Sequence, residues 1–283
     1  MKTTFLIPGI LLILLLLLFV WFAVPYSPLK ADFNKVYKKA VQKNSRVMGS
    51  FSAEFLADKP RLLRDYIAYC GLIDQPMMHH SVTIHNNVDF LLQPGKPMVK
   101  IEYTQVNFAN TYERVAFVDT KMAVVLPFQG LDSYIDGKAE MKGVLGKLLT
   151  LFDVRGPEIN QSALVTVLAE AIVCPSFLMK DNIAWEQLDD NHLKATLSQY
   201  GITVSGVFKF AEDGAIISFY TKDRYQENNG QITKLDWIAR CGNYKERDGI
   251  KFPTFFQGIW VLPDGTEQIY FDCNDINVQF FTE

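Results

Sequence analysis

Strand-like runs alternate with tight turns throughout residues 183–283, and this pattern constrains the fold more than any other feature of the chain. The turn signals are Glu212-Asp213-Gly214, Asn228-Asn229-Gly230, Asp248-Gly249 and Pro263-Asp264-Gly265. A residue such as Asn or Asp followed by Gly is a strong short-range signal for a hairpin. The runs between them are Ile202 to Phe210, Ala215 to Tyr225, Gln231 to Cys241, Ile250 to Leu262 and Glu267 to Phe281. Sequential hairpins predict an up-and-down antiparallel meander.

A second array of strands is expected over residues 76–137. Its runs are rich in β-branched and aromatic residues, and they cover Met78 to Leu92, Met98 to Phe108, Tyr112 to Val118 and Met122 to Phe128. Turns are expected at Gln93-Pro94-Gly95, Ala109-Asn110 and Asp119-Thr120. The segment 141–180 between the two arrays reads as helical, beginning with Met141 to Leu151.

Bulky side chains on both faces of some strands indicate that the sheet is covered. Phe252, Phe256 and Trp260 share one face of their run, whereas Ile259 and Val261 lie on the other. A sheet with one face in water would alternate more strictly. The predicted fold class is therefore α+β: a large curved antiparallel β-meander, an open or half barrel, with helices packed on its concave face.

One helix within Asp153 to Met179 connects the two arrays. Gly156-Pro157 breaks the preceding element, Asn160 is a plausible N-cap, and Cys174-Pro175 ends the helix. The stretch from 163 to 173 is apolar nearly all round, so the helix should be buried.

Three polar residues of this helix form one narrow stripe. Ser162, Thr166 and Glu170 recur every four residues. The stripe is either a solvated edge or the wall of a cavity with Glu170 as its ionisable group. Together with Arg155 and Glu158, these residues are the candidate ligand-binding set. No catalytic residue is assigned.

The N-terminus carries an uncharged run from Phe5 to Val24, long enough at 1.5 Å per residue to cross a bilayer core. No cleavage site follows it, so we expect an uncleaved transmembrane anchor over residues 1–27. Residues 28–58 then form a juxtamembrane helix and connector, and 59–283 the globular domain. The amphipathic run Leu29 to Met48 either lies on anionic lipid or packs on its own domain. A further helix is expected from Pro60 to Gly71.

Two arguments about the side of the membrane disagree. Lysines after the span, from Lys30 to Lys43, favour a cytoplasmic domain by the positive-inside rule. A very short N-terminus with one lysine is the usual start of an export signal. We expect an extracytoplasmic domain in a bacterial cell envelope, because the fold expected from the resemblance described below is an exported one.

Composition excludes several classes of partner. A net charge of −3 argues against nucleic acid. The 4 cysteines are scattered without metal-ligand spacing, and we expect all of them to be buried thiols. The strand at Ile250 to Leu262 should lie between Cys241 and Cys273 and so prevent a bridge. His79 and His85 lie roughly 20 Å apart along one strand and cannot share a metal ion. We expect no metal and no cofactor.

Several segments resemble a family of uncharacterised bacterial membrane-associated proteins, known only as a domain of unknown function. They are KPRLLRDYIAYCGL (59–72), RGPEINQSALVTVLAEAIVCPSFL (155–178), IAWEQLDDNHLKATLSQYGITVSGVFKFAEDG (183–214) and WVLPDG (260–265). The chain departs from the family pattern at Val165-Thr166-Val167, where an aromatic residue is expected. The resemblance implies the fold and membrane association but no activity. By topology alone, the half barrel also resembles the lipoprotein-carrier fold.

No phosphate-binding loop, nucleophile elbow or HExxH motif is present. The carboxylate pairs Asp189-Asp190 and Asp272 to Asp275 lie at expected turns, as does His192. Three functions therefore remain: a membrane-anchored binding or carrier module for a lipid or other hydrophobic ligand, a membrane-proximal hydrolase with Glu170 as general base, and a non-catalytic envelope scaffold. The lack of a nucleophile or metal motif favours binding.

Overall fold

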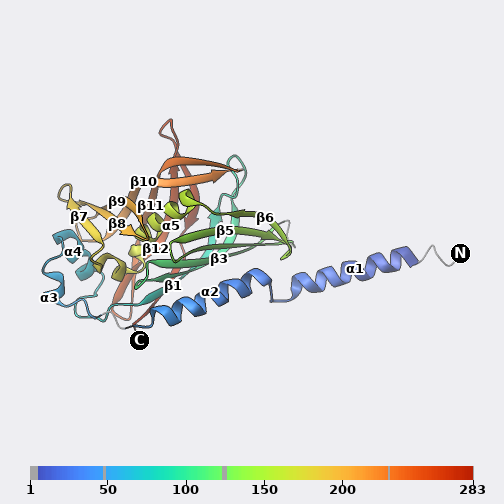
Figure 1. The fold of residues 1–283 in the computed structure, drawn as a ribbon, viewed down its shortest axis with the longest axis horizontal. Coiled ribbons are helices and arrows are strands. Elements are labelled where there is room, and N and C mark those ends of the chain that lie inside the picture. Colours follow the sequence, from blue (N-terminus) through green and yellow to red (C-terminus); the bar gives the residue numbers. More distant parts are fainter. Residues whose placement is uncertain (1–5, 47–48, 123–125, 229, 283) are drawn as a thin grey trace.

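The computed structural model describes residues 6–46, 49–122, 126–228 and 230–282 of the chain. A single antiparallel sheet of 14 strands forms most of the domain (Figure 1). Its first half contains β1 (His80–Phe90), β2 (Val99–Phe108), β3 (Glu113–Met122), β4 (Leu126–Ile135), β5 (Lys138–Leu145) and β6 (Leu149–Val154). Its second half contains β7 (Ile183–Gln187), β8 (His192–Gln199), β9 (Ile202–Phe210), β10 (Ile216–Asn228), β11 (Gln231–Arg247), β12 (Ile250–Val261), β13 (Glu267–Cys273) and β14 (Ile276–Phe281).

The strand order follows the chain in both halves. It runs β6-β5-β4-β3-β2-β1-β13-β12-β11-β10-β9-β8-β7, and β14 pairs with β1 off this path. The run expected as one strand from Glu267 to Phe281 is divided, because β13 and β14 both pair with β1. The two meanders expected from the turn signals therefore join edge to edge through β1. The predicted curved antiparallel meander is confirmed.

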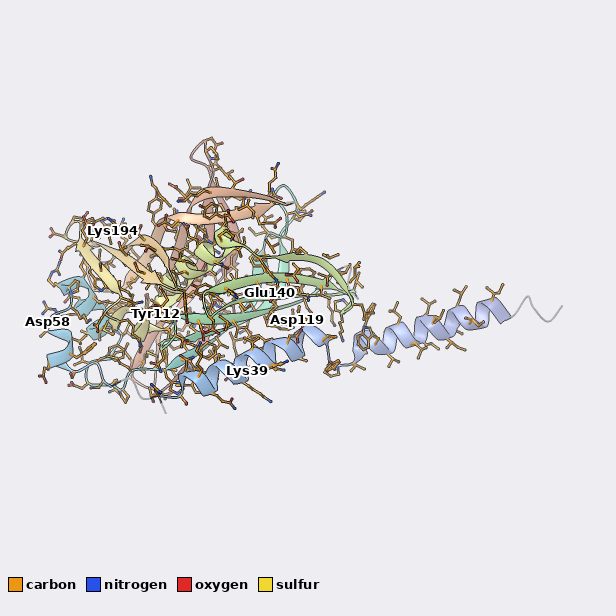
Figure 2. The ribbon with its side chains drawn as sticks, in the orientation of Figure 1. Lys39, Asp58, Tyr112, Asp119, Glu140 and Lys194 are labelled. Atoms are coloured by element: carbon orange, nitrogen blue, oxygen red, sulfur yellow. The ribbon has the colours of Figure 1, made fainter. Side chains whose placement is uncertain are left out.

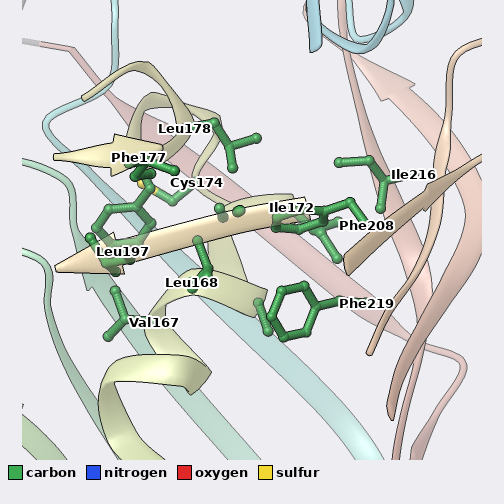
Figure 3. Packing of buried hydrophobic residues seen from close by; sticks show 14 of the residues in the cluster. Val167, Leu168, Ile172, Cys174, Phe177, Leu178, Leu197, Phe208, Ile216 and Phe219 are labelled. Atoms are coloured by element: carbon green, nitrogen blue, oxygen red, sulfur yellow. The ribbon is translucent and has the colours of Figure 1, made fainter. Parts of the chain in front are cut away.

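The concave face of the sheet is filled by the connection between its two outer edges. The chain leaves β6 and runs through α5 (Pro157–Ala169), η1 (Glu170–Ile172) and η2 (Pro175–Met179) before entering β7. Helix α5 contacts β9 and β10 of one half and β4 and β5 of the other. Figure 3 shows its Val167 and Leu168 packed beside Leu197, Phe208 and Phe219 from the strands. The almost uniformly apolar sequence of the helix matches its burial on nearly every side.

Close packing on this face requires a glycine in β9. A Cβ added to Gly206 would lie 2.0 Å from the ring of Phe219 on β10. Helix α4 (Arg61–Tyr69) closes the same core from one end, as expected for Pro60 to Gly71, and Tyr66 donates a 2.9 Å hydrogen bond to the carbonyl of Ile172. The short helix α3 (Ala53–Leu56) precedes it.

Helix α2 (Pro28–Asn44) packs on the opposite, convex face. Its Leu29 and Phe33 lie in a separate apolar cluster with Val115 and Phe117 of β3. Lys43 pairs with Glu113 at 2.6 Å. Of the two arrangements open for Leu29 to Met48, the structure therefore has the helix packed on its own domain; residues 47 and 48 lie outside the described part.

Helix α1 (Leu6–Ala23) projects away from the sheet, with its side chains free of the domain along most of its length (Figure 2). It is long and apolar enough to cross a membrane. Its C-terminal end meets the β5–β6 turn (Figure 1): Lys147 donates to the carbonyls of Trp21, Phe22, Val24 and Tyr26, and the Trp21 indole donates to the carbonyl of Gly146. Phe5, the first residue of the expected span, lies outside the described part of the chain.

Three local expectations are wrong. The segment from Met141 to Leu151 is not a helix but belongs to β5 and β6, since Gly143 and a turn at Gly146-Lys147 interrupt its helical period. Strand β3 continues through Asp119-Thr120 instead of turning there, as both residues pair with β4. Asn160 is not the N-cap: α5 begins at Pro157, and the Asn160 side chain accepts a hydrogen bond from the Ala139 amide.

The cysteine expectations agree with the structure. All four thiols are free and buried. Strand β12 separates the strands that carry Cys241 and Cys273, as the hairpin order predicts.

Candidate functional site

A two-chambered cavity lies between the concave face of the sheet and α5. The inner chamber, of about 230 Å³, is lined by buried and half-buried residues of β1 to β5, β10 to β13 and the α5–η1 segment, together with the exposed Phe152 of β6. The outer chamber, of about 890 Å³, extends to the β1–β2 loop and the tip of the β10–β11 hairpin. The two share a wall formed by Phe90, Leu92, Arg114, Phe128, Asp132, Met141, Phe152, Thr166, Arg224 and Tyr270. The outer chamber falls in the range of about 300–1,000 Å³ that is usual for small-molecule sites, and the inner chamber is smaller.

A buried ion-pair network forms the polar part of the inner chamber. Arg114 on β3 donates from Nε to Glu170 Oε2 at 2.8 Å and from Nη1 to Asp132 Oδ2 at 2.5 Å. Its Nη2 donates to the hydroxyl of Tyr103 at 2.7 Å. Asn107 supplies a second donor to Glu170 at 2.7 Å. These bonds fix Glu170 and Arg114 against each other across the cavity wall.

Burial raises the pKa of Glu170, and the nearby Arg114 guanidinium and the Asn107 amide oppose that rise. Burial also lowers the pKa of His85 to about 3, with Arg114 adding to the effect, so this imidazole is neutral at pH 7. Both ring nitrogens of His85 are buried without a hydrogen-bond partner among the described residues. Tyr103 and Phe271 pack edge-on against the ring. Near His85, the inner chamber is thus lined by a neutral imidazole, aromatic rings and the paired Arg114 and Glu170.

An aromatic wall on the second half of the sheet carries one further cation. Trp237 on β11 and Trp260 on β12 are direct cross-strand partners. Tyr270 stacks on Trp260, and its hydroxyl accepts a 3.2 Å hydrogen bond from the indole nitrogen of Trp237. The Arg224 guanidinium lies 4.1 Å from the Trp237 ring centroid and 5.2 Å from that of Trp260.

The structure divides the candidate set predicted from the sequence. Ser162, Thr166 and Glu170 are each 8% exposed, so the stripe is not a solvated edge. All three line the cavity, Glu170 in the inner chamber, Ser162 in the outer, and Thr166 in both. The Ser162 hydroxyl also accepts a hydrogen bond from the Tyr225 amide. A ligand-binding role for these residues stays a prediction.

Arg155 and Glu158 lie away from this cavity. Arg155 is bound to Glu140 and Asp153 and borders a separate, polar hollow of about 550 Å³ beneath α2. Glu158 is half-buried in the first turn of α5. The cation that pairs with Glu170 is Arg114 and not Arg155.

Sequence reasoning missed Arg114, Asp132 and Arg224. Arg114 carried a signal: in β3 it shares a face with Ala116 and Val118, so a charged residue stands in an otherwise apolar alternation. Arg224 carried none, because a register shift between Thr221 and Arg224 changes the face on which it lies.

The other sequence candidates remain peripheral. Asp189 accepts from the ring of His192 in the β7–β8 turn. Within the described residues, no group of His, Cys, Asp and Glu side chains has the arrangement of a metal site.

The fold and the cavity define a class of protein that encloses an apolar chamber between a curved antiparallel sheet and its connecting helix. Residues 49–273 match the model of a family of unknown function, DUF6544, and the chain belongs to that family. The family expected from the sequence motifs is thereby confirmed. No curated protein matches the chain in sequence.

Among solved structures, a LolA superfamily protein of Nitrosomonas europaea is similar, with a TM-score of 0.36 and 13% sequence identity over 76% of this chain and 92% of that one. A similarity of this size carries no information on function.

Proposed function

We propose that this protein is a membrane-anchored binding or carrier module that holds a hydrophobic ligand, such as a lipid, in the cavity beneath its sheet. The observation that carries the proposal is the composition of that cavity. Aromatic and aliphatic side chains form most of its lining, and Arg114, Glu170 and Asp132 in the inner chamber are paired with one another. An apolar ligand would replace water there without breaking those pairs.

Membrane anchorage is the second part of the proposal. It rests on α1 and on the surface beside its C-terminal end. Leu148 and Leu149, in the β5–β6 hairpin, are 70% and 60% exposed, and Lys147 between them and α1 binds four carbonyls at the end of that helix. Exposed leucines next to a membrane-spanning helix would lie in the same lipid layer.

Cavity and anchor lie near each other. Leu151 and Phe152, which follow in β6, line the outer chamber of the cavity. The edge of the cavity is therefore formed by the same strand that begins beside the end of α1. A ligand could pass between bilayer and cavity along this edge without crossing a wide aqueous gap.

The geometry of Glu170 favours binding over hydrolysis. A general base must be able to take up the proton that it removes. Arg114 and Asn107 hold Glu170 Oε2 in the wall, and the Arg114 guanidinium beside it disfavours protonation of the carboxylate. These contacts suit a structural ion pair.

Native mass spectrometry of the full chain, released from a non-ionic detergent, tests the proposal. We expect a bound amphiphile on the wild-type chain and its loss in Thr166→Trp, because Thr166 borders both chambers and an indole there would obstruct the passage between them. Thr203→Trp on the exposed face of β9 is the matched control. A wild-type chain that carries no amphiphile, even after addition of excess lipid, would contradict the proposal.

A further inference from the structure

Arg224 lies on the concave face because β10 contains a bulge. Thr221 pairs with Trp237, but Arg224 pairs with Leu235, so three steps along β10 match two along β11. The extra residue returns Arg224 to the face that carries Leu235 and Trp237. Without the bulge, Arg224 would point away from the cavity.

The guanidinium is stacked but lacks a hydrogen-bond acceptor. It rests over Trp237 and Trp260, which hold the planar group by its face. Its Nη1 is buried and has no hydrogen-bond partner within the part of the chain that the structure describes. Leaving a buried charged donor unpaired is costly, so this edge is suited to an acceptor supplied from outside the chain.

The neighbouring charges do not neutralise Arg224. In the inner chamber, Arg114 is paired with Glu170 and Asp132. Asp223, the adjacent residue, accepts from Ser205 and pairs with Lys234. Glu227 borders the outer chamber but makes no ion pair with Arg224 among the described residues. Lys142 also lines the inner chamber and is the other cation that could bind an anionic group there.

The chemistry of the cavity therefore combines an apolar chamber with a stacked guanidinium on its wall. Arg binds carboxylate and phosphate groups through two parallel N–H donors. A neutral head group would accept weaker hydrogen bonds from the guanidinium than an anion does, and a cationic head group would be repelled by it.

We propose that Arg224, stacked on Trp237 and Trp260, binds the anionic head group of an amphiphile whose alkyl chain fills the cavity. The inference rests on the proposed function and narrows its ligand to an amphiphile with a carboxylate or a phosphate.

Competition binding on the full chain in non-ionic detergent tests this inference. Radiolabelled hexadecanoate is displaced by unlabelled hexadecanoate, hexadecyl phosphate or hexadecanol, at a pH at which the carboxylate is ionised. These competitors share one alkyl chain, and the two anions distinguish a carboxylate from a phosphate source. Partition into micelles is the same for every variant, so the ratio of anion to alcohol affinity is the readout.

For the wild type, we expect at least one anion to bind about 10-fold or more tightly than hexadecanol, the size of a charge-assisted hydrogen bond. Arg224→Gln should reduce that ratio to near one while hexadecanol still competes, which also shows that the cavity is intact. Arg224→Lys should retain part of the preference for the anion, since lysine keeps the positive charge and loses the two parallel N–H donors. Arg240→Gln, an exposed arginine of β11 paired with Glu267, should change nothing.

The outcomes separate the two proposals. Equal affinity of anions and alcohol in the wild type, or loss of the preference in Lys142→Gln and not in Arg224→Gln, would overturn the role of Arg224 and leave the binding cavity standing. Failure of all three competitors to displace the label, or no specific binding of the label, would contradict the proposed function itself. If Arg224→Gln does not fold, the ratio of anion to alcohol affinity in the wild type and its partial retention in Arg224→Lys still test the role of Arg224.

Discussion

At the scale of single residues, Arg114 explains how a carboxylate can lie inside an apolar wall. A lone buried Glu170 would lose its charge or unfold its surroundings. The positive charge of Arg114 pairs with the carboxylates of both Glu170 and Asp132. Two carboxylates and one guanidinium leave one net negative charge, and Asp132 is the partner nearer to solvent.

Glu170→Gln tests this pairing. The change leaves the buried Arg114 with Asp132 as its remaining carboxylate partner, and we expect the free energy of unfolding to fall by about 3 kcal/mol. Thermal or denaturant melts of the full chain in detergent measure it. Glu140→Gln, which breaks the surface pair with Arg155, is the control and should cost less than about 0.5 kcal/mol. An equally small loss for Glu170→Gln would reject the structural role.

His85 should make the domain sensitive to acid. Its pKa is about 3 in the folded protein and about 6.5 when unfolded, so between these values the unfolded chain binds more protons. Its contribution to stability is intact above pH 6.5 and is lost as the pH falls. From pH 7 to pH 5 this amounts to about 2 kcal/mol, and His80, with a pKa lowered to about 4 by burial and by His79, acts in the same direction.

His85→Leu should therefore lose less stability than the wild type between pH 7 and pH 5, by about 2 kcal/mol. Denaturant melts at both pH values measure the difference. His192→Leu, at the exposed β7–β8 turn, is the control for replacing a histidine by leucine outside the buried chamber. Parallel pH profiles for His85→Leu and the wild type would show that His85 is not the group responsible.

The residue scale also shows where sequence reasoning succeeds and where it stops. The stripe of Ser162, Thr166 and Glu170 follows from helical period alone, and the structure places all three on the cavity wall. The partners of Ser162 and Glu170 come from strands 56 to 63 residues away, and helical period does not say which residues meet across a sheet. The inward turn of Arg224 depends on a bulge, which simple alternation cannot anticipate.

At the scale of elements, the hairpins could be predicted from the sequence, but one segment with a helical pattern forms strands. Turn pairs such as Asp248-Gly249 define hairpins locally, so β9 to β12 agree with expectation. The apolar residues of Met141 to Leu151 fit a helical period, yet pairing with β4 places the segment in the sheet. Tertiary pairing overrides local preference here because β4 would otherwise be an unpaired edge.

The β5–β6 hairpin carries the element-scale prediction. If α1 crosses a bilayer, Leu148 should touch lipid, because Lys147 fixes the hairpin to the end of that helix. A fluorophore on Leu148→Cys, in the full chain in lipid nanodiscs, should emit as in an apolar medium and be quenched by spin-labelled lipids. The four native cysteines are buried and should not react.

Leu188→Cys provides the control for this measurement. Leu188 is 48% exposed and lies beside β7, at the end of the domain opposite α1 (Figure 1). A label there should emit as in water. Water-like emission from labels at both positions would show that the β5–β6 hairpin does not contact lipid.

At the scale of the whole molecule, a single antiparallel sheet, a crossing helix and an apolar span combine into one arrangement. Helix α5 joins the two outer edges of the sheet and separates the apolar core from the cavity. The span approaches the domain at the strand that borders the outer chamber. The fold class could be predicted because strand and turn signals repeat locally; the cavity could not, since it is defined by side chains from both halves of the sheet.

The central claim is that an amphiphile occupies this cavity, and fluorescence quenching tests it most directly. With Trp21 and Trp185 replaced by Phe, Trp237 and Trp260 remain as reporters on the cavity wall. Bromine quenches tryptophan only at short range, so a chain-brominated fatty acid should quench these two strongly and saturably. A second chain that retains Trp185 on β7 as well as Trp237 and Trp260 should leave a larger fraction of its emission unquenched, because Trp185 lines neither chamber. No saturable quenching of Trp237 and Trp260, or equal quenching of both chains, would contradict the account.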